Sequence, residues 1–153
     1  MANPANRNSK ADRYLASYQK MCLFPFTAAL LSLFATFLLY ANNEFALNIS
    51  FFLIRKLHLI GMEILYLWLI GMGIAFVFLF LTILAAKGKW YLLFIPLALL
   101  VADVILGFTL VGQIDNGGMV VAMIIRFLFI FAVVFAIVMA RLTLRELRKE
   151  KQG

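Results

Sequence analysis

Two residues of opposite charge lie inside long apolar stretches of this sequence. Asp103 and Arg126 are each the single charged residue of an otherwise uncharged run, and a polar turn over residues 113–118 joins the two runs. A charge at membrane depth costs at least about 2.5 kcal/mol on insertion scales, so it rarely faces lipid and usually has a partner. We therefore predict that both side chains face the interior of a helix bundle.

The distance of each charge from the turn is compatible with a direct ion pair. Asp103 precedes Asp115 by twelve residues and Arg126 follows Gly118 by eight, so their depths differ by about 6 Å at 1.5 Å per residue. Helical side chains lean toward the N-terminus of their helix, however, which turns these two groups away from each other. Asp115 or Glu63 could bind Arg126 instead, leaving Asp103 protonated and hydrogen-bonded.

These alternatives imply different functions. A buried ion pair, or a polar clasp, would order a helix bundle, and we favour this interpretation. A protonatable carboxyl near the bilayer midplane is instead the usual basis of proton coupling. The transport interpretation makes Asp103 and Glu63 the proton or cation sites and Arg126 their counter-ion.

The composition requires the bilayer as solvent. Of 153 residues, 65% are hydrophobic and 14% are charged, and the mean hydropathy is +1.02. A soluble domain of this size has too high a surface-to-volume ratio to bury so much apolar surface. The net charge of +7 does not indicate nucleic acid as a partner, because the basic residues flank apolar runs, where anionic headgroups attract them.

Four apolar stretches are long enough to cross about 30 Å of hydrocarbon. We predict an all-α integral membrane protein whose transmembrane domain, 21–140, is an antiparallel bundle of four transmembrane helices. A basic N-terminal segment, 1–20, precedes this domain and a basic tail, 141–153, follows it. The spans are placed at about 21–40, 62–86, 90–112 and 119–140.

The Lys and Arg residues beside the spans predict the orientation. The N-terminal segment, the gap between the second and third spans and the tail together carry 11 of them, against Arg55 and Lys56 on the other side. Both termini are therefore expected in the cytoplasm, and the expected location is the plasma (cytoplasmic) membrane. The tail residues expected to contact anionic lipid are Arg141, Arg145, Arg148 and Lys149.

The segment 45–61 lies between the first and second spans. Its part from Phe51 to Gly61 is apolar around a basic centre, which favours a short interfacial helix with Gly61 as a bend. A helical extension of the second span is the alternative. In the same segment, Asn48-Ile49-Ser50 matches the N-glycosylation pattern, which is short and common.

Small residues indicate where helices touch. Gly71 with Ala75 and Ala98 with Ala102 are spaced as small-xxx-small pairs, which let helices approach closely in membranes. Since Ala102 adjoins Asp103, we expect its face of the third span to lie in the interior.

Neither a catalytic constellation nor a metal-ligand cluster is found in the sequence. His58 is the one histidine and Cys22 the one cysteine, which excludes bis-His haem ligation within one chain, an intrachain disulfide and a CxxC redox pair. A phosphate-binding glycine loop and a nucleophile elbow are also absent. We therefore predict no enzymatic activity, no catalytic residues, no cofactor and no metal.

These observations favour a small, non-enzymatic, multi-pass membrane protein with a buried Asp/Arg polar clasp. It would act as an accessory, assembly or self-associating membrane factor. The alternative is a small oligomeric proton- or ion-coupled transporter or channel that uses Asp103. The expected partners are the bilayer, with anionic headgroups on its cytoplasmic side, and a homo-oligomer or larger membrane complex.

Overall fold

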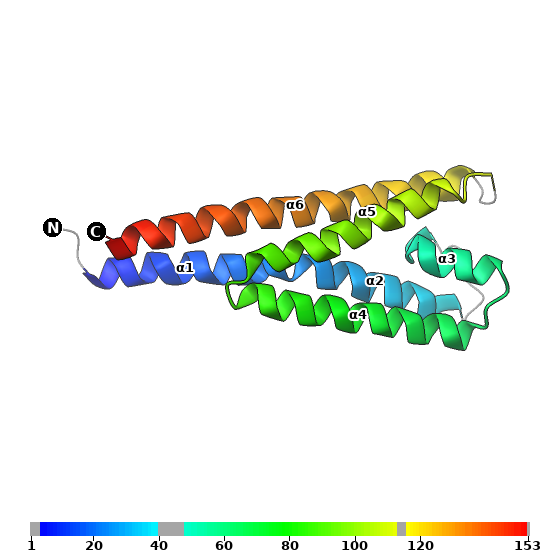
Figure 1. Ribbon diagram of the computed structural model, residues 1–153, viewed down its shortest axis with the longest axis horizontal. Helices are drawn as coiled ribbons and strands as arrows, with labels where there is room; N and C mark the ends of the chain where they lie inside the picture. The colour runs from blue at the N-terminus through cyan, green and yellow to red at the C-terminus, as the bar shows by residue number, and fades with distance from the viewer. Residues whose placement is uncertain (1–3, 40–47, 113–115, 153) are drawn as a thin grey trace.

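The structure, a computed structural model, describes residues 4–39, 48–112 and 116–152. All the regular secondary structure in these ranges is helical (Figure 1). Four stretches are long and apolar enough to cross a membrane, namely Asp12–Leu38, Ile64–Ala86, Trp90–Phe108 and Gly117–Glu146. The prediction of an all-α protein with four apolar spans is confirmed.

The elements follow one another in a simple order. They are α1 (Pro4–Cys22), α2 (Phe24–Leu38), α3 (Phe52–Leu59), α4 (Ile64–Ala86), the short 3-10 helix η3 (Trp90–Leu93), α5 (Phe94–Phe108) and α6 (Asn116–Gln152). The first span is thus made of two helices that continue along one line (Figure 1). The break between them falls at Leu23, two residues before Pro25, which lacks an amide hydrogen and fits the first turn of a helix.

Three span boundaries differ from those expected. The first apolar span already begins at Asp12, because α1 and α2 follow each other almost without interruption. The third helix ends at Phe108, and residues 109–112 form turns. The last helix has 37 residues and is therefore about 55 Å long at 1.5 Å per residue, which exceeds the thickness of the hydrocarbon layer.

The two chain termini lie at the same end of the molecule, and α1 and α6 extend past the turn between α4 and η3 at that end (Figure 1). We call this the terminal end, and the opposite one the α3 end. Gly88 makes the turn at the terminal end with φ +96, a conformation that favours glycine. Helix α2 packs chiefly on α4, while α6 packs on both α1 and α5.

Small residues bring α2 and α4 together. Gly71 and Ala75 are both buried, and a Cβ added at Gly71 would lie 3.2 Å from the Leu33 Cδ1 atom of α2. The second small pair is different, because Ala98 and Ala102 are both exposed. The expectation that the face of Ala102 is interior is wrong, since successive residues of a helix point about 100° apart and burial of Asp103 says little about its neighbour.

Helix α3 is a separate element and does not extend the second span. It ends at Leu59, and Gly61 turns the chain with φ +85 before α4 begins at Ile64. In its first turn Phe52 and Ile54 are buried, each at 0% exposure, whereas Leu53 is 39% exposed. The helix contacts α4 and α5. In Figure 1, α3 lies between α4 and the last turns of α5, so one face of its first turn packs inside the molecule. Residues 45–47 lie outside the described ranges.

Candidate functional site

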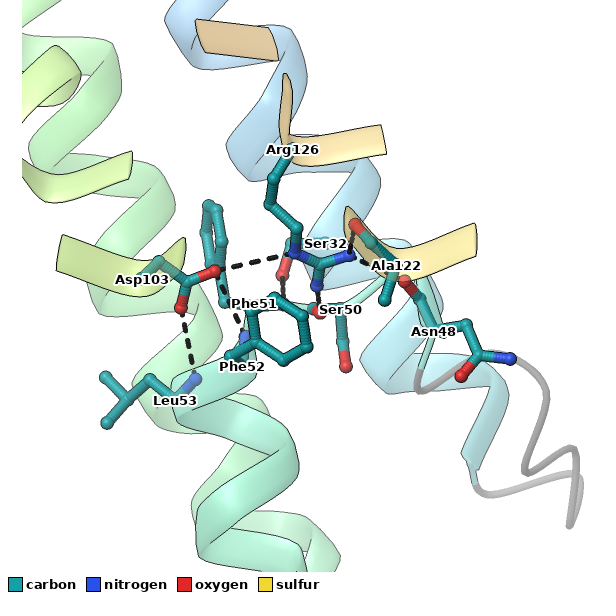
Figure 2. Close-up of polar contacts among 9 residues, drawn as sticks. All are labelled: Ser32, Asn48, Ser50, Phe51, Phe52, Leu53, Asp103, Ala122 and Arg126. Atoms are coloured by element: carbon teal, nitrogen blue, oxygen red, sulfur yellow. Dashed lines mark hydrogen bonds and ion pairs between the residues drawn. The ribbon is translucent and has the colours of Figure 1, made fainter. Parts of the chain in front are cut away.

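Asp103 and Arg126 are both buried and lie next to each other. The side chain of Arg126 is 2% exposed and that of Asp103 is 8% exposed, and Arg126 Nε lies 3.5 Å from Asp103 Oδ2 (Figure 2). This distance makes an ion pair, although the Nε–H finds no hydrogen-bond acceptor among the described atoms. The guanidinium therefore uses its other nitrogens for hydrogen bonding.

The carboxylate of Asp103 binds the start of α3. Its Oδ2 atom accepts a hydrogen bond from the Phe52 amide at 3.1 Å, and Oδ1 accepts one from the Leu53 amide at 3.1 Å. These amides belong to the first turn of α3, where no intrahelical acceptor is available. Because Phe51 at the N-cap position offers no side-chain cap, Asp103 caps α3 from another helix, and its negative charge also suits the helix dipole.

The guanidinium of Arg126 binds the chain just before α3. Its Nη1 donates to the Asn48 carbonyl oxygen at 2.6 Å and to the Ala122 carbonyl oxygen at 2.9 Å, while Nη2 donates to the Ser50 carbonyl oxygen. Its Cζ atom also lies 4.3 Å from the centroid of the Phe52 ring, a cation–π contact. One planar group thus serves three carbonyl acceptors and an aromatic face.

A hydroxyl on α2 completes this arrangement. The Phe51 amide donates to Ser32 Oγ at 2.9 Å. We call Ser32, Asp103 and Arg126 the clasp, since these three side chains bind five main-chain groups of residues 48–53 (Figure 2). Irregular backbone at membrane depth is tolerated only where protein groups satisfy its peptide units, and the clasp meets this requirement.

Two glycines leave space for the segment that the clasp holds. A Cβ added at Gly107 would lie 2.5 Å from the ring of Phe52, and one added at Gly118 would lie 2.8 Å from Asn48 Oδ1. Gly107 is one turn after Asp103 on α5, so the ring packs beside the carboxylate that caps its own helix. Sequence reasoning missed both glycines and Ser32, because nothing in their spacing distinguishes them from ordinary residues of apolar helices.

Two proposed partners of Arg126 are not part of the clasp. Glu63 is exposed at the start of α4. Within the ranges that the structure describes, the ion pairs join Asp103 to Arg126 and Lys149 to Glu146, so neither involves Glu63. Asp115 lies outside the described residues. Of the three residues predicted to form a transport site, the structure therefore brings Asp103 and Arg126 together and leaves Glu63 apart.

The sequence match to N-glycosylation falls on buried residues. Asn48 is 5% exposed and Ser50 is 0% exposed. Besides the carbonyl contacts described above, Asn48 Oδ1 accepts a hydrogen bond from the Arg55 guanidinium. The asparagine is consequently inaccessible to a modifying enzyme in the folded protein, and its polar atoms serve the packing of α3.

The basic residues of α6 lie away from the clasp, at the terminal end. All four tail residues predicted to meet anionic lipid are exposed, and they line a hollow with Trp90: Arg141, Arg145, Arg148 and Lys149. Lys149 Nζ also lies 2.9 Å from Glu146 Oε1. In the described part of the chain, no three His, Cys, Asp or Glu side chains are close enough together to hold a metal ion.

The fold defines a class of protein, an all-helical chain whose four apolar helices suit a multi-pass membrane protein. No protein-family model matches this chain, and neither a curated protein nor a solved structure matches it. The geometry of the clasp and of the surfaces around it is therefore the basis for assigning a function.

Proposed function

We propose that this chain is a non-enzymatic structural protein of the plasma membrane, acting as an accessory, assembly or self-associating factor. One observation carries the proposal: Asp103 and Arg126 direct their polar atoms to the main chain of residues 48–53. A carboxylate that carries protons or ions needs access to a polar path. Asp103 is instead paired with Arg126 and accepts two amide hydrogen bonds, an arrangement that supports a role in holding α3.

The proposed topology is an antiparallel bundle of four spans with both termini in the cytoplasm. The common position of the two termini in Figure 1 and the exposed basic residues of α6 at that end support it. In this topology the basic tail contacts anionic headgroups of the cytoplasmic leaflet.

Cysteine labelling tests this orientation. In a background that replaces the buried Cys22, Lys56→Cys at the α3 end should react with a membrane-impermeant maleimide in intact cells. Arg145→Cys at the terminal end should react only after permeabilisation. Both native side chains are exposed, so accessibility of the site itself does not bias the comparison. The reverse labelling pattern would overturn the orientation.

An accessory or self-associating factor should have a companion in the membrane. Extraction in a mild detergent, followed by native mass spectrometry, should give a defined assembly with a second copy or a stoichiometric partner. Arg126→Gln, which disturbs the position of α3, should reduce that assembly more than the exposed-surface change Leu128→Ala on α6. A strictly monomeric protein under all mild conditions would contradict the proposal.

A second candidate function is a small oligomeric proton- or ion-coupled transporter or channel. One observation favours it, because Asp103 is 8% exposed and borders a cavity, so its carboxylate is not wholly enclosed. Reconstituted wild type, Asp103→Asn and Arg126→Gln should then differ in coupled flux. Absence of flux over a broad panel of ions and substrates would exclude this function, whereas saturable flux lost in Asp103→Asn would replace the structural proposal.

A further inference from the structure

A cavity adjoins the clasp where α3, α4 and α5 meet. Its volume is about 130 Å³, and its lining residues are Phe51, Leu53, Ile74, Phe78, Leu99 and Asp103. Asp103 is the one polar side chain in this set. A dry apolar cavity of roughly 150 Å³ binds a molecule of the size of benzene, so this cavity has room for a short part of a hydrocarbon molecule.

The cavity reaches the surface that the membrane would cover. Two of its lining residues, Leu53 and Leu99, are 39% and 46% exposed. Leu99 belongs to the apolar span Trp90–Phe108, so the opening faces hydrocarbon when this span crosses a bilayer. A molecule dissolved in the bilayer can therefore enter from the side.

Asp103 retains an acceptor position. A carboxylate offers about four positions for donors. Its Oδ2 atom accepts a hydrogen bond from the Phe52 amide and faces Arg126 Nε. Among the residues that the structure describes, Oδ1 accepts a hydrogen bond from the Leu53 amide alone. One more donor can therefore bind Oδ1 without displacing a contact of the clasp.

The charges around the cavity select against ions. The positive charge of Arg126 balances that of Asp103, and Arg55, bound to Asn48 Oδ1, adds a further positive charge to the same region. A cation would thus lack a free counter-charge, and an anion would meet the carboxylate at close range. A neutral donor, such as a hydroxyl, avoids both costs.

We propose that this cavity binds a neutral lipid alcohol, a long-chain molecule with an apolar body and one hydroxyl, whose hydroxyl donates to Asp103 Oδ1. The chain of the alcohol would lie against Leu53, Ile74 and Leu99 and leave through the opening. This site goes beyond the structural role proposed above, and it depends only on the placement of the spans in the membrane.

Photolabelling in lipid nanodiscs tests the site. The probe is a long-chain alcohol with a diazirine near its hydroxyl end, and labelled peptides are identified by mass spectrometry. We expect saturable labelling of the peptides that contain Leu53, Ile74 and Leu99. The unlabelled alcohol should compete at least about tenfold better than the alkane of equal length, which is the effect of one hydrogen bond to a charged acceptor.

A matched pair of variants provides the control. Leu99→Trp fills the opening and should abolish saturable labelling, whereas Leu128→Trp, at a site 64% exposed on α6, should leave it unchanged. Ile74→Phe adds volume from the α4 wall and gives an independent test if Leu99→Trp does not fold. Circular dichroism and gel filtration check that each variant is intact.

Two results would overturn the inference. Equal and unsaturable labelling by alcohol and alkane probes, spread over all lipid-facing helices, would show general partitioning into lipid. Stronger competition by an alkylammonium than by the alcohol would show a cation site and favour the transport function. Neither the assembly measurement nor the flux assay depends on this ligand, so failure here is distinguishable from failure of the proposed function.

Discussion

The buried polar contacts at the two ends of the molecule differ in whether the side chains that make them are charged. At the terminal end, the Tyr18 hydroxyl donates to the Ala85 carbonyl oxygen near the end of α4, among apolar neighbours. The same carbonyl also accepts the Gly88 amide at 2.9 Å. At the α3 end, by contrast, two full charges and a hydroxyl bind the main chain. At both ends the contacts are made near the end of a helix, α4 or α3. The use of charged groups at only one of them must therefore follow from the surroundings of that helix end.

The residues that follow α4 are exposed, whereas Phe52 at the start of α3 is buried. Lys87, Gly88 and Lys89 are all exposed, so water can satisfy the last peptide groups of α4. Phe52, at the start of α3, has no exposed surface, and its amide depends on protein acceptors. In this protein, buried charge therefore occurs where the backbone is irregular and enclosed. At the end of α4, where Ala85 is buried but the residues after it are exposed, the buried contact is a neutral hydroxyl.

The largest effect should follow from Arg126→Gln. The change leaves Asp103 without its counter-charge and weakens the hydrogen bonding of two enclosed carbonyls, so we expect a loss of about 3–5 kcal/mol in the free energy of unfolding. Arg126→Lys, which keeps the charge without the planar fork, should cost less. Reversible unfolding in mixed detergent micelles measures both. A loss below about 1 kcal/mol for Arg126→Gln would remove the distinction between the two ends.

The second largest loss in the free energy of unfolding, about 2–3 kcal/mol, is expected for Asp103→Asn, since this change removes the charge but keeps one acceptor oxygen. The double variant with Arg126→Gln should be more stable than the sum of the two losses predicts, by about 0.5–3 kcal/mol. Full recovery is not expected, because the double variant still lacks the guanidinium that binds Asn48 and Ser50. Strictly additive losses would argue against coupling across the 3.5 Å ion pair.

A steric change that leaves the charges intact should have an intermediate effect. Gly107→Ala places a Cβ 2.5 Å from the Phe52 ring, and overpacking of this kind costs about 1–3 kcal/mol. The matched control is Gly73→Ala on α4, where a Cβ would meet nothing within 4 Å. This control should be neutral or stabilising, since alanine favours helices by about 1 kcal/mol over glycine. Equal losses in both variants would contradict the close packing of Phe52 on α5.

The smallest effect should come from Tyr18→Phe at the terminal end. The Ala85 carbonyl keeps the Gly88 amide as a donor, so only the hydroxyl contact is lost, at about 0.5–1.5 kcal/mol. Unfolding in the same micelles measures this variant beside the others. A loss as large as that of Arg126→Gln would mean that the buried contacts at the two ends are energetically equivalent.

The sequence was sufficient to predict the four apolar spans, whereas it left open whether Asp103 pairs with Arg126. The difference in depth between Asp103 and Arg126 was small enough for pairing, and the predicted lean of Arg126 toward the start of its helix agrees with its bond to Ala122. That lean also explains why the planar fork reaches the main chain and leaves Nε beside the carboxylate. Residue spacing was enough for the spans and for the compatible depths of the two charges, but it did not choose Asp103 over Asp115 or Glu63 as the partner of Arg126.

The groups that Asp103 and Arg126 bind could not be predicted from the sequence, for a physical reason. Their principal partners are peptide groups of residues 48–53, and every residue but proline carries the same peptide donor and acceptor. The residue types therefore gave no signal that this segment enters the bundle. Ser32 and Gly107 were ordinary in their sequence context, and the basic centre of α3 suggested a helix on the membrane surface.

The position of Arg126 in the chain has a consequence for biosynthesis. The Ser50 carbonyl lies 76 residues before the guanidinium that binds it. At about 5–20 residues per second, a ribosome needs roughly 4–15 s to make that stretch. Asp103 is made before this interval ends, but until Arg126 follows it the chain has no guanidinium to bind the Ser50 carbonyl. Insertion of the last helix must therefore precede the final docking of α3, although α3 is made long before it.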